Sequence, residues 1–229
     1  MTSADPVLDT VRRKLSIAPG PGATLHQRLR IPVAPPTAEA VRPEVPSLVR
    51  DLIPVVRSGA VAERIEAAGV LRELARLSAA DAGEAVPALR AALRDPAGMR
   101  TESDPDGSET FADRHYVREA AARALLAIDP AGCAAELIPV MIELMGRPSG
   151  QMVPRPWTYV RFRDDEWRAL GPAAVAALRA ALTHPPVEAE PPADEAERLL
   201  WQFAPAARPA PPHESIRLGA AEALRALGV

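Results

Sequence analysis

The chain has very little of the residues that build disulfide-rich or sheet-rich proteins. It contains one cysteine among 229 residues, so Cys133 can form neither an intramolecular disulfide nor a thiolate metal cluster. Aromatic residues make up only 3% of the chain, whereas hydrophobic residues reach 48%, and much of that share is alanine. This composition favours closely packed helices over a β-sandwich, whose core needs branched and aromatic side chains.

The chain also lacks a strong charge and a long apolar run. Its net charge is −3, which gives no general attraction to nucleic acid or to anionic lipid. Lys14 is the only lysine among 27 basic residues, a bias typical of GC-rich bacterial genomes. No stretch approaches the roughly 18 apolar residues of a membrane helix, and Met1 to Ser16 lacks the apolar core of a signal peptide. We therefore expect a soluble, cytoplasmic protein that does not contact a membrane.

What is present is one helix face, repeated. Offsets of 3, 4, 7 and 10 residues keep side chains on one stripe of an α-helix. Three copies with these offsets are Arg64, Ala67, Ala68, Leu71 and Leu74; Arg118, Ala121, Ala122, Leu125 and Ile128; and Arg217, Ala220, Ala221, Leu224 and Leu227. A weaker copy is Arg163, Glu166, Trp167 and Leu170. The alanines allow a neighbouring helix to approach closely, and such a unit buries its apolar face only against its neighbours, so the pattern predicts a stack of helices.

A second helix follows most copies of this stripe. Its clearest form is Ala88 to Leu93, which recurs letter for letter as Ala177 to Leu182. Short turns join the two helices, with Asp129-Pro130 as an N-cap and first-position proline and Gly171-Pro172 as a helix end and a helix start. The connections to the next first helix are long, at roughly 95–114, 146–161 and 183–213, and insertions at one place in a repeat emerge on one edge of a stack.

The pattern Arg-x-x-Ala-Ala-x-x-Leu, a short turn, and then Val-Pro-Ala-Leu resembles HEAT-like repeats. Its best copies are Val117–Leu144, Ile65–Leu93 and Ile216–Gly228. The resemblance implies an all-α protein, an α-solenoid of about four to five antiparallel helix pairs with long inter-repeat loops, over residues 41–229. Residues 1–40, rich in proline, are expected to form a partly extended lead-in or a capping helix. In that family the solenoid chiefly binds other macromolecules.

The candidate binding residues come from two places. All the aromatic residues follow position 110, and arginine alternates with aromatics between 155 and 163, as in a recognition edge, although the same aromatics could equally pack the long connections onto the helices. The second helices carry Arg50, Arg90, Arg94 and Arg179, with Glu136 and Glu143 between them, and Arg90 and Arg179 occupy the same place in the repeated hexapeptide. These residues could line a mixed-charge groove for an acidic partner, or form a solvated helix face or an ion pair kept by the repeat. The predicted binding residues are Arg155, Trp157, Tyr159, Arg161, Phe162, Trp167, Arg90 and Arg179.

Catalytic and metal chemistry finds little support. The loop Glu102 to Asp113 has acids at places 1, 3, 5 and 12 and glycine at place 6, as in a calcium loop, but Pro105 stiffens it and a solvated acidic loop is preferred. The four histidines are scattered, and Asp113 beside His115 has no neighbouring nucleophile. We predict no catalytic residue, no metal and no cofactor.

These features predict a non-catalytic protein–protein interaction module, a scaffold, regulator or neutralising partner that is a monomer by itself. It would bind an unidentified protein through its inner helices and the aromatic and arginine edge. The alternative is a DNA-processing enzyme resembling the HEAT-like alkylation-repair glycosylases, with Trp157, Trp167 and Asp164 or Asp165 as analogues by residue type alone. The acidic chain makes nucleic-acid binding the weaker interpretation. A third resemblance, to bilin-lyase relatives of these repeats, has no specific chromophore contact to support it.

Overall fold

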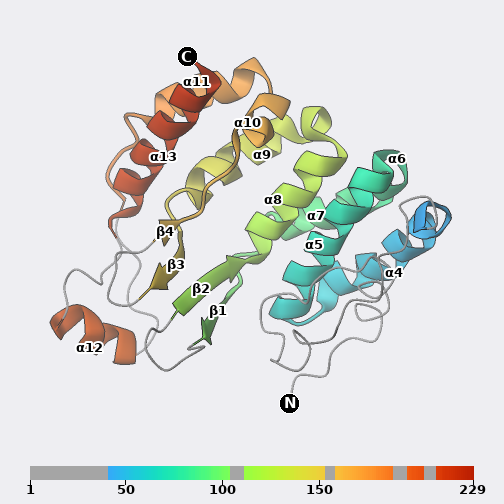
Figure 1. Ribbon diagram of the computed structural model, residues 1–229, viewed down its shortest axis with the longest axis horizontal. Coiled ribbons are helices and arrows are strands. Elements are labelled where there is room, and N and C mark those ends of the chain that lie inside the picture. The colour runs from blue at the N-terminus through green and yellow to red at the C-terminus, as the bar shows by residue number, and fades with distance from the viewer. Residues whose placement is uncertain (1–40, 104–110, 153–157, 188–194, 204–209) are drawn as a thin grey trace. The chain divides into compact units, whose positions relative to one another are not determined.

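The computed structural model describes residues 41–103, 111–152, 158–187, 195–203 and 210–229, and these are mostly helical (Figure 1). The predicted lead-in, residues 1–40, lies outside the described residues. The helices are α4 (Val45–Ser58), α5 (Val61–Leu77), α6 (Ala79–Ala82), α7 (Val86–Ala92), α8 (Val117–Ile128), α9 (Pro130–Leu144), α10 (Asp164–Ala169), α11 (Pro172–Ala181), α12 (Glu195–Phe203) and α13 (Pro212–Leu227). Short 3-10 turns, Arg42–Glu44 and Gly83–Ala85, precede α4 and α7.

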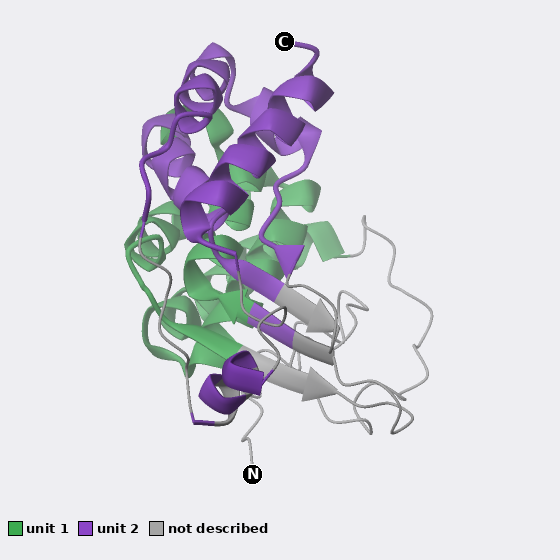
Figure 2. Ribbon diagram, turned by 90° about the vertical axis from the view of Figure 1, so that its left-hand side faces the viewer, with its two compact units in different colours: residues 1–99, 115–133 green, residues 100–114, 134–229 purple. Residues whose placement is uncertain are grey.

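The chain divides into two compact units (Figure 2). Unit 1 consists of residues 1–99 and 115–133, and unit 2 of residues 100–114 and 134–229. The boundary falls within α9, so this helix belongs to both units. The predicted repeat domain over 41–229 therefore contains more than one compact body.

In unit 1 the repeated stripe is the buried face. Ala67, Ala68 and Leu71 of α5 and Ala122 and Leu125 of α8 are all 0% exposed. Helix α5 packs against α8, α4 packs against both α5 and α7, and α7 packs against α8. The buried faces of both helices carry alanine, whose short side chain allows neighbouring backbones to approach, together with leucine, which fills the space between helices. The predicted role of the stripe as a helix–helix contact is confirmed in this unit.

The turns within the helix pairs have the predicted chemistry. The carboxylate of Asp129 accepts a hydrogen bond from the backbone N–H of Gly132 at 2.9 Å, which makes Asp129 the N-cap of α9. Gly171 ends α10 with a φ of 71°, a conformation that glycine adopts without steric cost, and Pro172 begins α11. These turns are short enough to make the consecutive helices antiparallel neighbours.

Two of the long connections contain strands, which the all-α prediction did not include. Strands β1 (Gly98–Ser103) and β2 (Phe111–Tyr116) lie in the first connection, and β3 (Pro148–Met152) and β4 (Thr158–Tyr159) lie in the second. The four form one sheet in the order β1-β2-β3-β4. Strand β2 pairs antiparallel with β3, with Phe111 opposite Met152 and Asp113 opposite Gly150. The two insertions thus satisfy their backbone groups against each other, as insertions on one edge can.

In unit 2 the helices α10, α11 and α13 pack against one another. The buried residues of α13 include Ala220 and Leu224, which are the repeat positions, and Trp167 and Leu170 fill the corresponding places of α10. The hydroxyl of Ser215, itself buried, donates to the carbonyl of Met145 at 2.8 Å and fixes the start of α13 to the end of α9. The weak fourth copy of the repeat is therefore also a packed helix face.

Replacing Gly69 by alanine is expected to stabilise unit 1. It lies inside α5, and a Cβ added there would meet no atom within 4 Å apart from its own helix surroundings. Glycine in a helix interior costs about 0.8–1 kcal/mol relative to alanine. Gly69→Ala should therefore raise the free energy of unfolding by about 0.5–1 kcal/mol, measured by urea denaturation followed by circular dichroism.

Gly59→Ala is the matched control for that substitution. A Cβ at Gly59 would lie 2.7 Å from the backbone oxygen of Val55, so this change should destabilise the protein. A loss of stability in Gly69→Ala would mean that the outer side of α5 at this point is covered rather than open.

Candidate binding surfaces

The segment 158–162 of the predicted recognition edge is held against unit 2 by its own side chains. Tyr159 is half-buried, and its hydroxyl donates to the backbone carbonyl of Ala210 at 3.2 Å. Burial raises the pKa of this hydroxyl above its ordinary value of 10.0, although the charge of Arg161 acts in the opposite direction. Tyr159 therefore remains neutral and acts as a hydrogen-bond donor that ties the segment to the start of α13.

Arg161 fastens the same segment to α13. Its Nε lies 3.1 Å from a carboxylate oxygen of Glu222, and its Nη1 donates to the backbone oxygen of Val160 at 3.1 Å. The guanidinium passes close over Gly219, where an added Cβ would lie 3.3 Å from Nη1 and 2.9 Å from the sulfur of Met145. A side chain at position 219 would require the sulfur of Met145 to move and the Arg161 guanidinium to shift slightly, so the absence of a side chain at Gly219 gives both groups their room.

The next two aromatic residues are interior side chains. Phe162 is 7% exposed and Trp167 is 1% exposed, and their rings meet edge to face with centroids 5.9 Å apart and planes inclined by 77°. Such a contact stabilises the fold beyond the area that it buries. Phe162 and Trp167 therefore pack inside unit 2, as the packing interpretation of the aromatic segment expects. A ring that is enclosed in this way offers no face to a partner.

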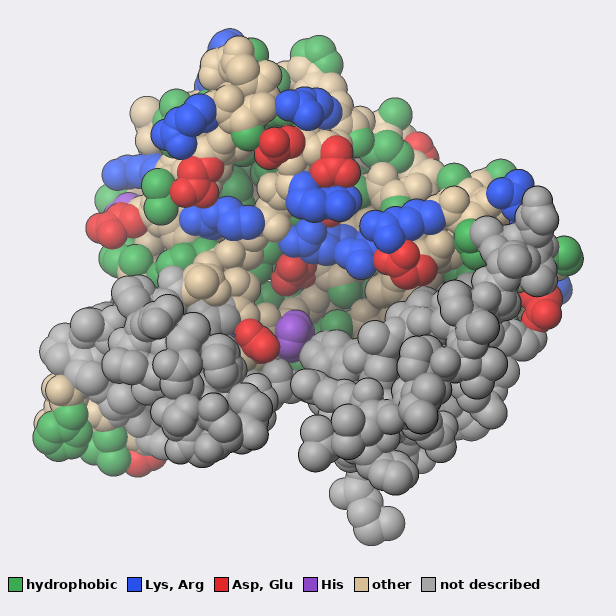
Figure 3. Space-filling view, viewed as in Figure 1, with side chains coloured by type: hydrophobic (Ala, Val, Ile, Leu, Met, Phe, Trp, Pro, Cys, Tyr) green, Lys and Arg blue, Asp and Glu red, His purple; other side chains and the backbone are tan. Residues whose placement is uncertain are grey.

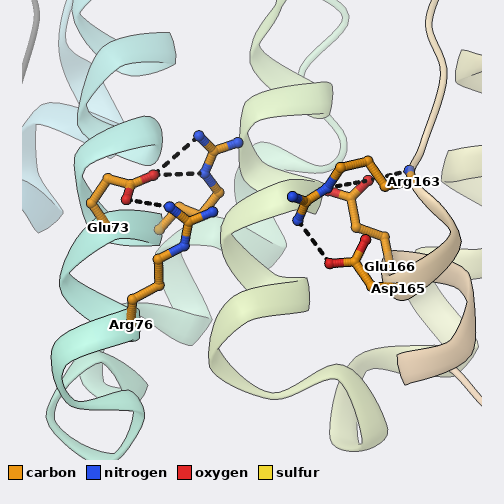
Figure 4. A network of polar contacts seen from close by, with 6 residues as sticks. Glu73, Arg76, Arg163, Asp165 and Glu166 are labelled. Carbon is orange, nitrogen blue, oxygen red and sulfur yellow. Dashed lines mark hydrogen bonds and ion pairs between the residues drawn. The ribbon is translucent and has the colours of Figure 1, made fainter.

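The polar residues around Trp167 complete the start of α10. The carboxylate of Glu166, only 7% exposed as a residue, accepts a hydrogen bond from the backbone N–H of Arg163 at 2.6 Å. Arg163 also forms a salt bridge with Asp165 at 3.1 Å (Figure 4). Glu166 thus takes the third position of a helix N-terminus and satisfies a backbone donor that would otherwise lack a helical partner.

The repeated arginine has a recurring structural task. Nε of Arg118 donates to the carbonyl of Leu93, at the end of α7, at 2.9 Å. Arg217 donates through Nε and Nη2 to the carbonyl of His184, just beyond α11, at 3.0 and 2.6 Å. Arg64 makes an ion pair with Asp95, which also follows α7. In each case a cation meets the C-terminal end of a second helix, where carbonyl groups lack helical partners and the helix dipole is negative.

Removing one of these arginines should cost more than an average surface substitution. Hydrogen bonds made by a charged group contribute about 1.5–3 kcal/mol, and Arg217 is only partly exposed. We expect Arg217→Ala to lower the free energy of unfolding by about that amount in urea denaturation. Arg225→Ala, on the exposed side of the same helix, should change it by less than about 0.5 kcal/mol. Equal effects of the two substitutions would contradict the proposed task.

The first-helix face of unit 1 carries paired charges. Glu73 of α5 forms salt bridges with Arg72 at 3.1 Å and with Arg76 at 2.6 Å (Figure 4). On α8, Arg123 pairs with Glu119 one turn earlier at 3.1 Å. In the view with α5 and α8 toward the reader, blue and red side chains lie next to one another over these helices (Figure 3). Charges paired in this way leave little net field to attract a partner.

The second helices of unit 1 instead carry more exposed arginines than carboxylates. We call the outward side chains of α4, of α7 and of the turn after α7 the second-helix face, whose members are Ser47, Arg50, Asp51, Pro54, Arg57, Pro87, Arg90, Ala91 and Arg94. Arg57 and Arg94 are exposed and form no salt bridge with a described residue, whereas Arg90 donates to the carbonyl of Gly132 at 3.0 Å. Sequence reasoning named Arg50, Arg90 and Arg94 here but missed Arg57, which lies two helical turns after Arg50.

The remaining predicted residues are scattered. Arg179 is exposed on α11. It belongs to unit 2, whereas Arg90 belongs to unit 1. Arg155 and Trp157 lie outside the described residues, and so do positions 104–110 of the acidic loop. The tryptophan and acid pair of the glycosylase interpretation is not assembled among described residues, since Trp167 is buried while Asp164 and Asp165 are exposed.

The described part of the chain holds no group of three or more histidine, cysteine or acidic side chains suited to a metal ion. Within the same ranges, no helix has both the length and the apolar character to cross a membrane. Comparison with protein-family models, curated proteins and solved structures finds no match to the chain.

Proposed function

We propose that this chain is a non-catalytic binding module in which HEAT-like helix pairs stack into a short α-solenoid and present their second helices to a protein partner. The packing of unit 1 supports the stack: α5 lies against α8, α4 lies against α7, and each pair of neighbours is linked through α4–α5 and α7–α8. Repeated alanines and leucines fill the contact between the first helices. Such units carry surfaces for binding rather than a reaction centre.

The observation that carries this proposal is the difference between the two faces of unit 1. Charges on α5 and α8 are paired within the helices, whereas α4 and α7 expose arginines with one carboxylate, Asp51, among the described side chains of these two helices. Arginine is among the residues that contribute most to protein interfaces. An unbalanced arginine surface on neighbouring helices is therefore the best-supported contact area.

The second part of the proposal concerns the edge formed by the long connections. Tyr159 and Arg161 attach this edge to unit 2, and Phe162 and Trp167 support it from the interior. Arg155 and Trp157 remain the predicted contact residues of the edge. In this proposal Tyr159 and Arg161 have a structural role, and Arg155 and Trp157 contact the partner.

Purification of the tagged full chain from its source organism tests the function. We expect one protein to be retained in about a 1:1 ratio, identified by mass spectrometry after size-exclusion chromatography. Arg57→Glu with Arg94→Glu should release it if the second-helix face is the contact, and Trp157→Ala should release it if the connection edge is. Arg76→Glu on the first-helix face, which is exposed as well, serves as the control.

The absence of any stoichiometric protein, or conversion of a small molecule by the purified chain alone, would overturn the assignment as a binding module. A partner released by Arg76→Glu as readily as by the other variants would place the contact on the first helices instead. Arg57, Arg76 and Arg94 are exposed, so loss of the partner on their substitution would not reflect loss of the fold.

A further inference from the structure

The second-helix face has a charge opposite to that of the whole chain. Its exposed charged members are Arg50, Arg57 and Arg94 against Asp51, whereas the full sequence has a net charge of −3. A local basic surface on an acidic protein attracts acidic groups at short range, while the rest of the molecule repels extended polyanions. The face therefore discriminates between a short acidic segment and a long phosphate backbone.

The spacing of the arginines matches side chains on a helix or an extended peptide. Arg50 and Arg57 lie seven residues apart on α4, a rise of about 10.5 Å, and Arg94 lies two residues after the end of α7. Helices α4 and α7 pack against each other, so these exposed arginines come from neighbouring elements of unit 1. Carboxylates separated by one or two helical turns can meet guanidinium groups at these separations.

Uncharged residues on the same face provide an apolar surface beside the arginines. Pro54 of α4 and Pro87 and Ala91 of α7 are exposed. These side chains are short or rigid, so covering them costs little conformational entropy. A partner that combines acidic and apolar residues would use both kinds of surface.

We propose that the second-helix face binds an acidic segment of a protein partner, in which glutamate or aspartate side chains pair with Arg50, Arg57 and Arg94 while apolar side chains lie on Pro54, Pro87 and Ala91. This inference rests on the proposed function and gives it a partner class. The planar guanidinium donates two parallel hydrogen bonds to a carboxylate, which gives the contact direction as well as attraction. Arg90 of α7 is held by its hydrogen bond to the carbonyl of Gly132 and is not needed for this contact.

Nucleic acid is the competing ligand class, and the face argues against it. Asp51 lies among the arginines, and no described aromatic side chain belongs to α4 or α7 to stack on a base. A phosphate backbone would also extend over the rest of an acidic molecule. The acidic peptide is therefore the ligand that we assign.

Fluorescence anisotropy with the full chain tests this assignment. The probe is a labelled helical peptide of about 20 residues, long enough to be helical in water, with glutamate on one side and leucine on the other. The matched peptide has glutamine in place of each glutamate, and a single-stranded oligothymidylate of similar length represents nucleic acid. We expect the glutamate peptide to bind at least about tenfold more tightly than the glutamine peptide, and more weakly as salt rises from about 50 to about 150 mM.

The double substitution Arg57→Glu with Arg94→Glu should weaken binding of the glutamate peptide by at least about tenfold, because it replaces two attractions by two repulsions. Arg76→Glu, on the paired face, should leave the binding constant unchanged. Unchanged circular dichroism and thermal midpoints would show that both variants are folded. Equal binding of the glutamate and glutamine peptides, tighter binding of the oligothymidylate, or no effect of the double substitution would each overturn the inference.

Together, the purification and the peptide-binding experiments distinguish failure of the acidic-segment inference from failure of the proposed binding function. A stoichiometric partner that survives Arg57→Glu with Arg94→Glu, together with failure of the acidic peptide, would retain the binding module and refute the acidic segment. Specific binding of the glutamate peptide without any retained protein would support the surface and count against a stable protein complex.

Discussion

Replacing Trp167 with alanine is expected to lower the free energy of unfolding by about 3–5 kcal/mol. The indole is 1% exposed and meets the ring of Phe162 edge to face, so its removal leaves a cavity and also breaks an aromatic contact. A loss of this size is a large fraction of the stability of an ordinary domain. Urea denaturation followed by circular dichroism would measure the shift, and near-ultraviolet signals would report the altered packing.

Phe203→Ala is the control for the same type of residue. Phe203 belongs to α12 and is 80% exposed, so its substitution should change stability by less than about 0.5 kcal/mol. The comparison also decides between the two interpretations of the aromatic segment. If Trp167→Ala removed a partner but left stability intact, Trp167 would be a contact residue, and its enclosed position in unit 2 would be wrong.

The helical repeats could be predicted from the sequence because their signals are local. A stripe of arginine, alanine and leucine fixes which side of a helix is buried, and Asp129 and Gly171 mark helix boundaries through backbone chemistry that depends on one or two residues. The mostly helical fold follows from these signals. The repeated arginine was also visible, although its partner, the end of a second helix, emerged only with the fold.

The sheet could not be predicted in the same way. Strand β3 contains proline and glycine, which are depleted in strands, and its partner β2 lies about forty residues earlier in the chain. Pairing of this kind depends on two distant connections meeting on one edge. The positions of the long connections could be predicted from the sequence, but the hydrogen bonds between their strands could not.

The candidate site was predicted only in part for a related reason. Alternation of arginine and aromatic residues in 155–163 is equally consistent with a contact surface and with packing, and burial of Phe162 decides for packing at that position. The place of Arg161 depends on Gly219, which lies on a helix far along the chain. Arg57 was not predicted as a binding residue because it belongs to no repeated motif. Its relevance follows from the packing of α4 against α7, the helix that carries Arg90 and precedes Arg94.

Glu166 illustrates how a departure from a repeat can carry its own physical meaning. At the place where other copies have alanine, a carboxylate interrupts the small-residue stripe. Its hydrogen bond to the backbone N–H of Arg163 shows that it belongs to the start of α10, which begins closer to the repeat arginine than α5 or α13 does. The same bond is made in α5 by Glu63, which accepts from the N–H of Ala60 at 2.8 Å. The repeats therefore share a stripe but differ in where each helix begins.

The second large effect is expected from Leu125→Ala, in the contact between α5 and α8. Leu125 is 0% exposed and occupies the same repeat position as Leu71, which is equally buried on the facing helix. The same buried stripe of α8 carries Ala121 and Ala122, whose short side chains cannot extend to fill the space that the leucine leaves. Substitution of a buried leucine by alanine costs about 2–5 kcal/mol, and the rigid surroundings place the expected loss toward the upper part of that range.

Leu218→Ala provides the comparison, because Leu218 lies on a repeat helix but is 55% exposed, and its loss should be within about 0.5 kcal/mol. The physical premise under test is that the repeated stripe stabilises the protein through contacts between first helices. If Leu125→Ala unfolded at the same urea concentration as Leu218→Ala, the α5–α8 contact would contribute little to stability. The sequence stripe would then have to be explained by a contact outside unit 1.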